Sequence, residues 1–230
     1  MAPFIGAISL GGIKMKLFNI KWDVDTAGPS PNSNKRIELF LKGCNKAMEG
    51  NPCPGCFNEE LWDPTAEIEY DSAEIVETIL SKTNSKYITI GGGEPTDQIE
   101  ELIQLCKELK RKDFHVIVYT HHNLERKVFV EKDQNFKRLM KYSDMIISEP
   151  YIANLHQHRP TLGDGFYSSI GSSNQRVWDT SEYPAKQLLE DIQYFEAKDI
   201  DALAITQTRR AIYFLKPKFF KGTKEVGAHV

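Results

Sequence analysis

The sequence lacks several features that would point to a membrane protein or a nucleic-acid-binding protein. No apolar run approaches the roughly 20 residues that a membrane-spanning helix needs. The 29 Lys and Arg residues nearly balance the 32 Asp and Glu residues, and the formal net charge is −3. No global positive field therefore attracts nucleic acid or anionic lipid. We found no internal repeat and no low-complexity tract. We expect no membrane partner and no nucleic-acid partner.

The first residues also lack the marks of a secretory leader. Residues 1–10 are apolar and small, but they have no charged n-region and no clear cleavage site. Of the 230 residues, 40% are hydrophobic and 27% are charged, which is typical of a globular protein with a sizeable core. We expect a cytoplasmic protein with a core domain over residues 15–180. Residues 1–14 and 181–230 are expected to be extensions, the second packed on the core.

Strand and helix patterns alternate through the middle of the chain, which predicts an α/β fold with parallel strands. The predicted strands are Met15–Ile20, Arg36–Leu41, Lys86–Ile90, Phe114–Tyr119 and Asp144–Ser148. After Asp179 the pattern changes, and we expect a helix over Pro184–Ala197 and strands within Ala202–Leu215. The basic and aromatic stretch Ile205–Lys224 is read as an edge hairpin with a solvated face.

Capping residues place the helices between these strands. A capping box of Asp71 and Glu74 opens the first helix, and its expected buried stripe is Ile75, Val76, Ile79 and Leu80. A second capping box, Asp97 and Glu100, is expected to open the next helix. The apolar stripe of that helix is Ile99, Leu102, Ile103, Cys106 and Leu109. A short third helix is expected over Phe136–Tyr142.

Cysteines are few, and their placement favours metal binding over disulfides. Cys44, Cys53 and Cys56 lie in one short segment, whereas Cys106 lies on an apolar helical stripe, where a small buried residue belongs. Three thiolates suit an iron–sulfur cubane with one iron open to an outside ligand. Structural zinc needs four ligands. The alternative is therefore a non-enzymatic, zinc-stabilised binding module in which His156 or His158 completes the site.

The segment Gly91–Pro95 follows a predicted parallel strand, at the edge of the sheet where α/β proteins bind ligands. Glycines let the backbone approach a ligand closely, and free carbonyls accept hydrogen bonds from an ammonium group. Glu94 and Pro95 interrupt the geometry of a phosphate-binding loop, and no Lys-Ser/Thr pair follows. The loop therefore points away from nucleotide phosphates.

Together, the three cysteines and the Gly92-Gly93-Glu94-Pro95 segment resemble the radical S-adenosylmethionine superfamily. The resemblance implies a partial, open parallel βα barrel with a C-terminal α+β extension. It implies a [4Fe-4S] cluster on Cys44, Cys53 and Cys56, and S-adenosyl-L-methionine as the second cofactor. The glycine segment would contact the methionine amino group. Further cofactor contacts are expected from Phe57, Asn58 and Ser148.

Two departures from the superfamily pattern are visible. The usual spacing is C-x3-C-x2-C, whereas eight residues separate Cys44 from Cys53 here. The inserted stretch, about Lys46–Asn51, is polar and contains glycine, so we expect it to bulge outward at little entropic cost. The second departure is Ser148-Glu149, where the more closely similar proteins show Asp-Gly.

Longer strings narrow the resemblance to the activating proteins of anaerobic (class III) ribonucleotide reductase. They are Phe40–Asn45, Cys53–Asn58, Trp62-Asp63 and Gly171–Asp179. The resemblance implies reductive cleavage of S-adenosylmethionine to a 5′-deoxyadenosyl radical, which installs a glycyl radical on the large reductase subunit. A flavodoxin- or ferredoxin-type protein would supply the electron. The rival reading is a small-molecule radical enzyme similar to 7-carboxy-7-deazaguanine synthase.

Overall fold

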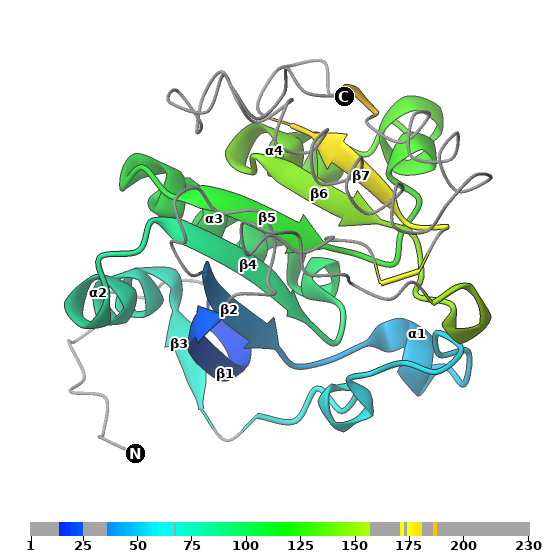
Figure 1. Cartoon of the computed structure of the whole chain (residues 1–230), viewed down its shortest axis with the longest axis horizontal. Coiled ribbons are helices and arrows are strands. Elements are labelled where there is room, and N and C mark those ends of the chain that lie inside the picture. Colours follow the sequence, from blue (N-terminus) through cyan, green and yellow to red (C-terminus); the bar gives the residue numbers. More distant parts are fainter. Residues whose placement is uncertain are drawn as a thin grey trace, which may run out of the picture.

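The computed structural model describes residues 14–24, 36–66, 68–156, 171–172, 174–180 and 186–187. These residues form one mixed sheet in the order β3-β1-β2-β4-β5-β6-β7-β8, with helices packed on it (Figure 1). The strands are β1 (Lys14–Val24), β2 (Arg36–Leu41), β3 (Glu69–Asp71), β4 (Tyr87–Gly92), β5 (His115–Tyr119), β6 (Met145–Ser148), β7 (Arg176–Asp179) and β8 (Lys186–Gln187). The helices are α1 (Asn45–Met48), α2 (Ser72–Lys82), α3 (Ile99–Arg111) and α4 (Gln134–Tyr142), with shorter turns η2 (Glu59–Leu61), η3 (Pro95–Gln98), η4 (Arg126–Val130) and η5 (Ala153–Leu155).

The centre of the sheet consists of four parallel strands, β2, β4, β5 and β6. Their register pairs Leu39 with Ile90, Ile90 with Val118, and Val118 with Ile146. The four strands are neighbours in the same order in which they follow one another along the chain. Because crossovers of one hand then all fall on one side, the connecting helices share a face of the sheet. Figure 1 shows α3 and α4 together behind the strands. The predicted parallel α/β arrangement is confirmed.

The edges of the sheet are antiparallel. β1 pairs with β2 and β3, and β7 pairs with β6 and β8, in each case antiparallel. Within the described residues β3 and β8 are the outermost strands and do not pair with each other. The structure therefore supports a mixed α/β sheet, and the open barrel stays a prediction.

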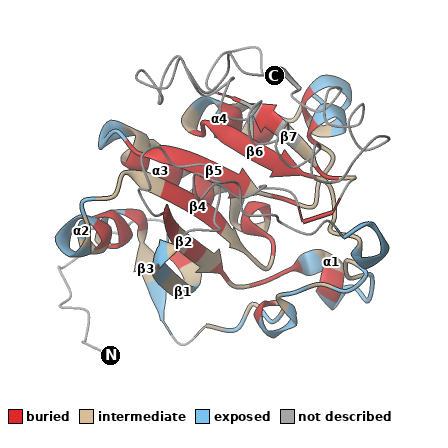
Figure 2. Ribbon diagram, in the orientation of Figure 1, coloured by how far each residue is buried: buried red, intermediate tan, exposed pale blue. Residues whose placement is uncertain are grey.

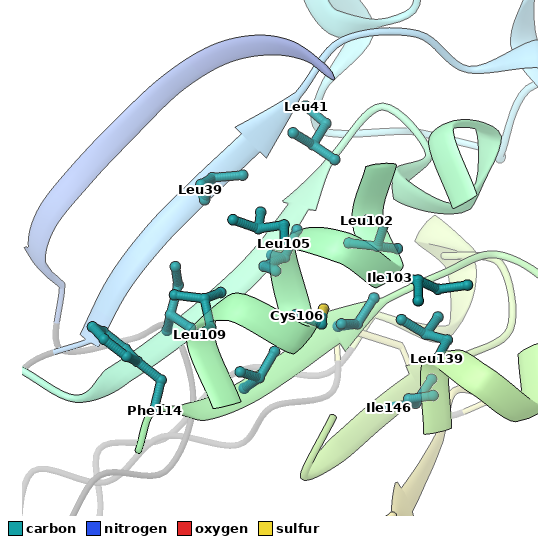
Figure 3. Packing of buried hydrophobic residues seen from close by; sticks show 14 of the residues in the cluster. Leu39, Leu41, Leu102, Ile103, Leu105, Cys106, Leu109, Phe114, Leu139 and Ile146 are labelled. Carbon is teal, nitrogen blue, oxygen red and sulfur yellow. The ribbon is translucent and has the colours of Figure 1, made fainter. Parts of the chain in front are cut away.

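The helix-covered face of the sheet holds the hydrophobic core. Alternate residues of β2, β4 and β5 point to this face and pack against α2, α3 and α4 (Figures 2 and 3). Cys106 lies at the centre of this packing and is completely buried, as predicted. The expected stripe of α2 is wrong at Leu80, whose side chain is 39% exposed. Leu80 lies at the margin of the stripe that Ile75, Val76 and Ile79 bury.

One of the two predicted capping boxes is confirmed. The Asp71 carboxylate accepts from the backbone N–H of Ala73 at 2.8 Å, and Glu74 accepts from that of Asp71 at 3.0 Å. The box of Asp97 and Glu100 is wrong. Pro95 starts the helical turn η3 earlier because its ring holds φ near the helical value, so Asp97 lies inside the turn and α3 begins at Ile99.

Several predictions fall on the termini. β1 begins at Lys14, one residue before the predicted core boundary, and residues 1–13 lie outside the described residues. Lys186 and Gln187 form β8, which corrects the helix predicted from Pro184 at these two positions. The rest of that helix, the strands within Ala202–Leu215 and the basic stretch also lie outside the described residues.

Candidate active site

A pocket opens on the face of the sheet that the helices leave free. Its floor is made by Glu38 and Phe40 from β2, Thr89 and Gly91 from β4, and Tyr119 from β5. These residues alternate along their strands with residues of the hydrophobic core. Side chains on a strand alternate between its faces, so the same strands build the core on one side and the pocket on the other.

The cysteine-bearing segment, residues 44–58, closes one side of this pocket. Gly43 has a φ of 97° and turns the chain out of β2, and its N–H then donates to the carbonyl of Leu61 at 2.8 Å. The Cys44 N–H donates to the carbonyl of Trp62 at 3.0 Å. The eight-residue spacing is taken up by the one-turn helix α1, where Ala47 is buried and Met48 is 59% exposed. The inserted residues therefore form one helical turn, which is anchored by the buried side chain of Ala47.

All three predicted cysteines line the pocket as free thiols, and two N–H donors converge on the sulfur of Cys56. The Cys56 Sγ accepts from Trp62 Nε1 and from the backbone of Asn58, both at 3.5 Å. Burial raises the pKa of the Cys53 thiol, and His121 lies close enough to Cys44 for the thiol to raise the pKa of the imidazole against the effect of burial. N–H donors around thiolate sulfur stabilise and tune iron–sulfur clusters. The donor set therefore fits a cluster held by three cysteines.

The fourth cysteine does not belong to this set. Cys106 lies on the opposite side of the sheet, and burial raises the pKa of its thiol far above the ordinary value. Among the described residues, no group of three or more His, Cys, Asp or Glu side chains converges closely enough to hold a single metal ion. His156, named for the zinc alternative, hydrogen-bonds Tyr151 Oη through Nδ1 at 3.1 Å, and His158 lies outside the described residues.

The glycine segment forms the adjoining wall of the pocket and packs against the residue before Cys44. Gly92 has a φ of 130°, and a methyl group on it would collide with the backbone of Leu41. A methyl on Gly93 would collide with the backbone carbonyls of Gly43 and Leu61. The two glycines are therefore required by the close approach of two backbones, whatever the pocket binds. Gly91, which points into the pocket, has open space around it.

Hydrogen bonds tie the glycine segment to the cysteine segment. Glu94 N–H donates to the carbonyl of Gly43 at 2.7 Å, and Asn58 Nδ2 donates to the carbonyl of Gly92 at 2.9 Å. The Asp97 carboxylate accepts from the backbone of Asn45 at 2.6 Å. This contact gives Asp97 a role that the predicted capping box did not describe. The two candidate binding elements thus form one unit.

Glu94 and His121 form a buried ion pair at the centre of that unit. His121 Nδ1 lies 2.6 Å from Glu94 Oε2, with side chains 15% and 2% exposed. Burial alone would raise the pKa of Glu94, but the hydrogen bonds and charge of His121 and the bond from Thr96 hold it well below its ordinary value. Burial alone would lower the pKa of His121, but hydrogen bonds to Cys44 and Glu94 raise it.

His121 is one of several pocket residues that our reading of the sequence missed. It directly follows Thr120 at the carboxyl end of the buried strand β5, where ligand-binding residues of parallel sheets gather. This position could have drawn attention to it. Its partners lie 27 and 77 positions away, however, so no local pattern connects them.

The remaining predicted residues divide into those that line the pocket and one that does not. Pro95, Phe57 and Asn58 line it, and Phe57, which is 65% exposed, packs against Tyr151 with ring centroids 4.5 Å apart and the rings tilted by 44°. Ser148 is completely buried beneath the lining, where its Oγ accepts from Trp178 Nε1 at 2.9 Å. Its neighbour Glu149 lines the pocket instead.

The turn after β6 is held from behind by the predicted Gly171–Asp179 segment. Gln175 Oε1 accepts from the N–H of Gly171 at 2.8 Å, while its Nε2 donates to the carbonyl of Glu149 at 3.3 Å. Asn174 Nδ2 donates to the carbonyl of Pro150 at 2.7 Å. Glu149 adopts a left-handed φ of 80°, and burial raises the pKa of its carboxyl. The segment therefore shapes the pocket wall, to which Gly171 and Gln175 also contribute.

The fold and site together define a mixed α/β protein with a three-cysteine centre beside a glycine-lined pocket. Residues 33–178 match the family model described as a 4Fe-4S single cluster domain, and the chain belongs to that family. This match supports an iron–sulfur cluster as a cofactor of the chain.

Curated relatives carry a more specific name. The chain is 29% identical over 171 residues to the pyruvate formate-lyase-activating enzyme of Staphylococcus epidermidis, which covers 67% of this chain and 64% of that protein. It is 28% identical over 171 residues to the enzyme of the same name from Staphylococcus aureus, with the same coverage. The chain thus spans 64% of the length of these relatives. None of the described helices is long and apolar enough to cross a membrane.

Proposed function

We propose that this chain is a radical S-adenosylmethionine enzyme that activates a glycyl-radical enzyme. The observation that carries the proposal is the meeting of three free cysteines and the glycine segment in one pocket, at the carboxyl ends of the parallel strands. The family match and the relatives named as activating enzymes support it.

We assign the following roles to the residues of the pocket. Cys44, Cys53 and Cys56 would hold a [4Fe-4S] cluster, and the pocket between Gly91, Glu149 and Tyr119 would hold S-adenosylmethionine. A bound cluster would supply one electron, received from an external donor, for the reductive cleavage of S-adenosylmethionine to methionine, and so the radical chemistry that removes a hydrogen atom from a glycine Cα. The chain orients these groups and limits the access of water to the pocket.

For the partner, we propose the large subunit of anaerobic ribonucleotide reductase. The segment Gly171–Asp179, one of the strings that carry this finer resemblance, contributes directly to the pocket wall through Gly171 and Gln175. The names of the curated relatives favour pyruvate formate-lyase as the second candidate. We propose a flavodoxin- or ferredoxin-type protein as the electron donor, because the cysteine-bearing segment exposes Met48 and Phe57 beside the cluster ligands.

The test is anaerobic mixing after reconstitution with iron and sulfide. We expect about four irons per chain, reductant-dependent release of 5′-deoxyadenosine, and a glycyl doublet in electron paramagnetic resonance when the reductase subunit is present. A doublet with pyruvate formate-lyase alone would reassign the partner. Turnover of a deazaguanine precursor without any glycyl radical would favour the small-molecule enzyme, and one zinc per chain without cleavage would favour the binding module.

A further inference from the structure

The helical turn between the first two cysteines begins at a residue that does not cap it. The N-cap of α1 is Cys44, whose backbone is extended (φ −148°, ψ 98°) and whose side chain makes no capping hydrogen bond. The first turn of α1 holds no acidic residue either. The first N–H groups of a helix need acceptors from outside the helix. An acceptor for α1 therefore has to come from another segment or from water.

Asp97 supplies this acceptor from the turn that follows the glycine segment. Its Oδ2 accepts from the backbone N–H of Asn45, the first residue of α1, at 2.6 Å. Asp97 lies in η3, and its own N–H donates to the carbonyl of Glu94 at 3.1 Å. The Glu94 N–H donates in turn to the carbonyl of Gly43 at 2.7 Å. One short segment thus bonds the residues on both sides of Cys44.

The two bonds beside Cys44 differ in what they require of the sequence. The bond from Glu94 to Gly43 joins two backbones, so it forms with any side chain at these positions. The bond from the Asn45 N–H needs a side-chain acceptor on η3. Eight residues separate the first two cysteines, and a longer loop loses more conformational entropy when it is ordered. The Asp97 carboxylate restricts this loop at its start.

We propose that Asp97 is a positioning residue for Cys44, because its carboxylate fixes the direction in which the chain leaves this ligand and so limits the positions of the sulfur. The inference rests on the cluster of the proposed function. It deepens that function by giving a part in the cluster site to a side chain that bonds the backbone and not a sulfur. Removing groups that orient a metal ligand typically weakens metal binding by about 10- to 100-fold.

The first test measures how fast the reconstituted cluster loses iron to a chelator, without S-adenosylmethionine or partner. Asp97→Ala removes the acceptor, and we expect iron release to be about tenfold faster than in the wild type. Asp97→Asn keeps a side-chain oxygen for the same N–H and should restore most of the wild-type rate. A wild-type rate in Asp97→Ala would overturn the inference.

The matched control is Asp133, which caps α4 on the helix-covered side of the sheet. Its carboxylate accepts from the N–H groups of Asn135 and Phe136 at 2.9 and 3.3 Å. Asp133→Ala therefore removes a cap of the same chemistry. It should lower the midpoint of thermal unfolding at least as far as Asp97→Ala does, while iron release stays at the wild-type rate. Equal acceleration in both variants would assign the effect to lost stability and overturn the inference.

The second test removes the donor of the same bond. Proline has no N–H and suits the first position of a helix, and the extended backbone of Cys44 is the conformation that a following proline favours. Asn45 is exposed. Asn45→Pro should accelerate iron release as Asp97→Ala does, and the double variant should add nothing, because both changes remove one bond. Additive effects, or a wild-type rate in Asn45→Pro, would overturn the inference.

These outcomes are separate from those that test the proposed function. If no partner acquires a glycyl radical but Asp97→Ala loses iron faster, the positioning role stands and the activase assignment falls. If the glycyl radical forms while Asp97→Ala keeps the wild-type rate, the positioning role falls and the activase stands. Failure of the wild type to take up iron would overturn both. Should Asp97→Ala fail to fold, Asn45→Pro compared with Asp133→Ala decides in the same way.

Discussion

Two buried polar clusters lie at opposite ends of the same parallel strands, and they differ in what they leave open. The amino-end cluster comprises Arg36, Lys110, His115 and Asp144. Arg36 is completely buried, donates through Nε to Thr89 Oγ1 at 2.8 Å and bonds the backbone carbonyls of Ile88 and His115. The carboxyl-end cluster comprises Cys44, Glu94, Thr96, Thr120 and His121, and it borders the pocket.

The comparison shows that buried polar groups which tie the strands together and those which border the pocket lie at opposite ends of one sheet. In the amino-end cluster the donors reach backbone carbonyls and carboxylates across β2, β4, β5 and β6, so the strands are tied together internally. Burial lowers the pKa of Arg36 to about 9, although Tyr119, Asp144, Tyr87 and Glu38 act in the opposite direction. In the carboxyl-end cluster Thr96 and His121 donate to the Glu94 carboxylate, and Cys44, Glu94, Thr120 and His121 line the pocket. We expect substitutions in the amino-end cluster to change the stability of the fold, and substitutions in the carboxyl-end cluster to change what the pocket binds.

The largest expected effect concerns the cysteines that line the pocket beside the carboxyl-end cluster. Cys44→Ala, Cys53→Ala or Cys56→Ala should each abolish cluster incorporation, measured as iron, sulfide and visible absorbance after anaerobic reconstitution. The control is Cys106→Ala, which should cost on the order of 1 kcal/mol through a small cavity and keep the cluster. A Cys106 variant that folds but holds no cluster would contradict the three-cysteine assignment.

The next effect concerns the amino-end cluster. Asp144 is 1% exposed and accepts from Lys110 Nζ at 2.6 Å and from the backbone of Val116 at 2.9 Å. Asp144→Asn should lower the free energy of unfolding by about 3 kcal/mol, because it leaves a partly buried ammonium without its charge partner. The exposed pair of Arg138 and Glu100 is the control, and Glu100→Gln should cost under about 1 kcal/mol. Urea unfolding measures both, and iron content should be unchanged in each.

The same carboxylate gives a pH dependence. Burial alone would raise the pKa of Asp144, but His115, Lys110 and the Val116 N–H outweigh burial and lower it below the ordinary 3.8. Because the folded pKa lies below the unfolded one, the stabilisation is present above about pH 4 and is lost as the pH falls through the folded value. Asp144→Asn should flatten this acid limb in urea unfolding. An equally steep acid limb would count against the assignment.

A smaller expected effect separates the packing role of the glycine segment from its role in ligand binding. Gly93→Ala should destabilise by about 2 kcal/mol, because its methyl meets the backbone of Gly43 and Leu61. Gly91→Ala has space and should change stability by under about 0.5 kcal/mol. Gly91→Leu should instead weaken S-adenosylmethionine binding in calorimetry at unchanged iron content, because its side chain enters the pocket. Equal stability of the two alanine variants would show that the close approach is absent.

The smallest effect is a gain in stability. Glu149 has a left-handed φ of 80°, and its Oε1 has no hydrogen-bond partner among the described residues. Glu149→Gly should raise the free energy of unfolding by about 0.5 to 1 kcal/mol, because glycine adopts this backbone without strain. If the carboxylate contacts the pocket ligand, the same variant should bind S-adenosylmethionine more weakly. A loss of stability on thermal unfolding would refute the strain argument.

Much of the fold could be predicted from local patterns. The strands β2, β5 and β6, the Asp71 and Glu74 capping box and the buried position of Cys106 follow from alternation, helical spacing and capping chemistry. The boundary of β4 could not be predicted, because Gly91 and Gly92 have no intrinsic strand preference and join the strand through pairing with Phe40 and Leu41. The predictions for Leu80 and Asp97 were wrong for local reasons: Leu80 lies at the margin of the buried stripe of α2, and Pro95 starts the helical turn before Asp97.

By itself, the sequence determined that three clustered cysteines stand apart from a fourth and that a Gly-Gly-Glu-Pro segment follows a strand. The positions of the cysteines and the order of motifs along the chain can be read directly from the sequence. Only the tertiary structure decided that the Glu94 carboxylate accepts hydrogen bonds from Thr96 and from His121. These bonds join residues from different strand ends, and a hydrogen bond depends on atoms coming within about 3 Å. That distance is set by how the strands pack side by side, which no local pattern records.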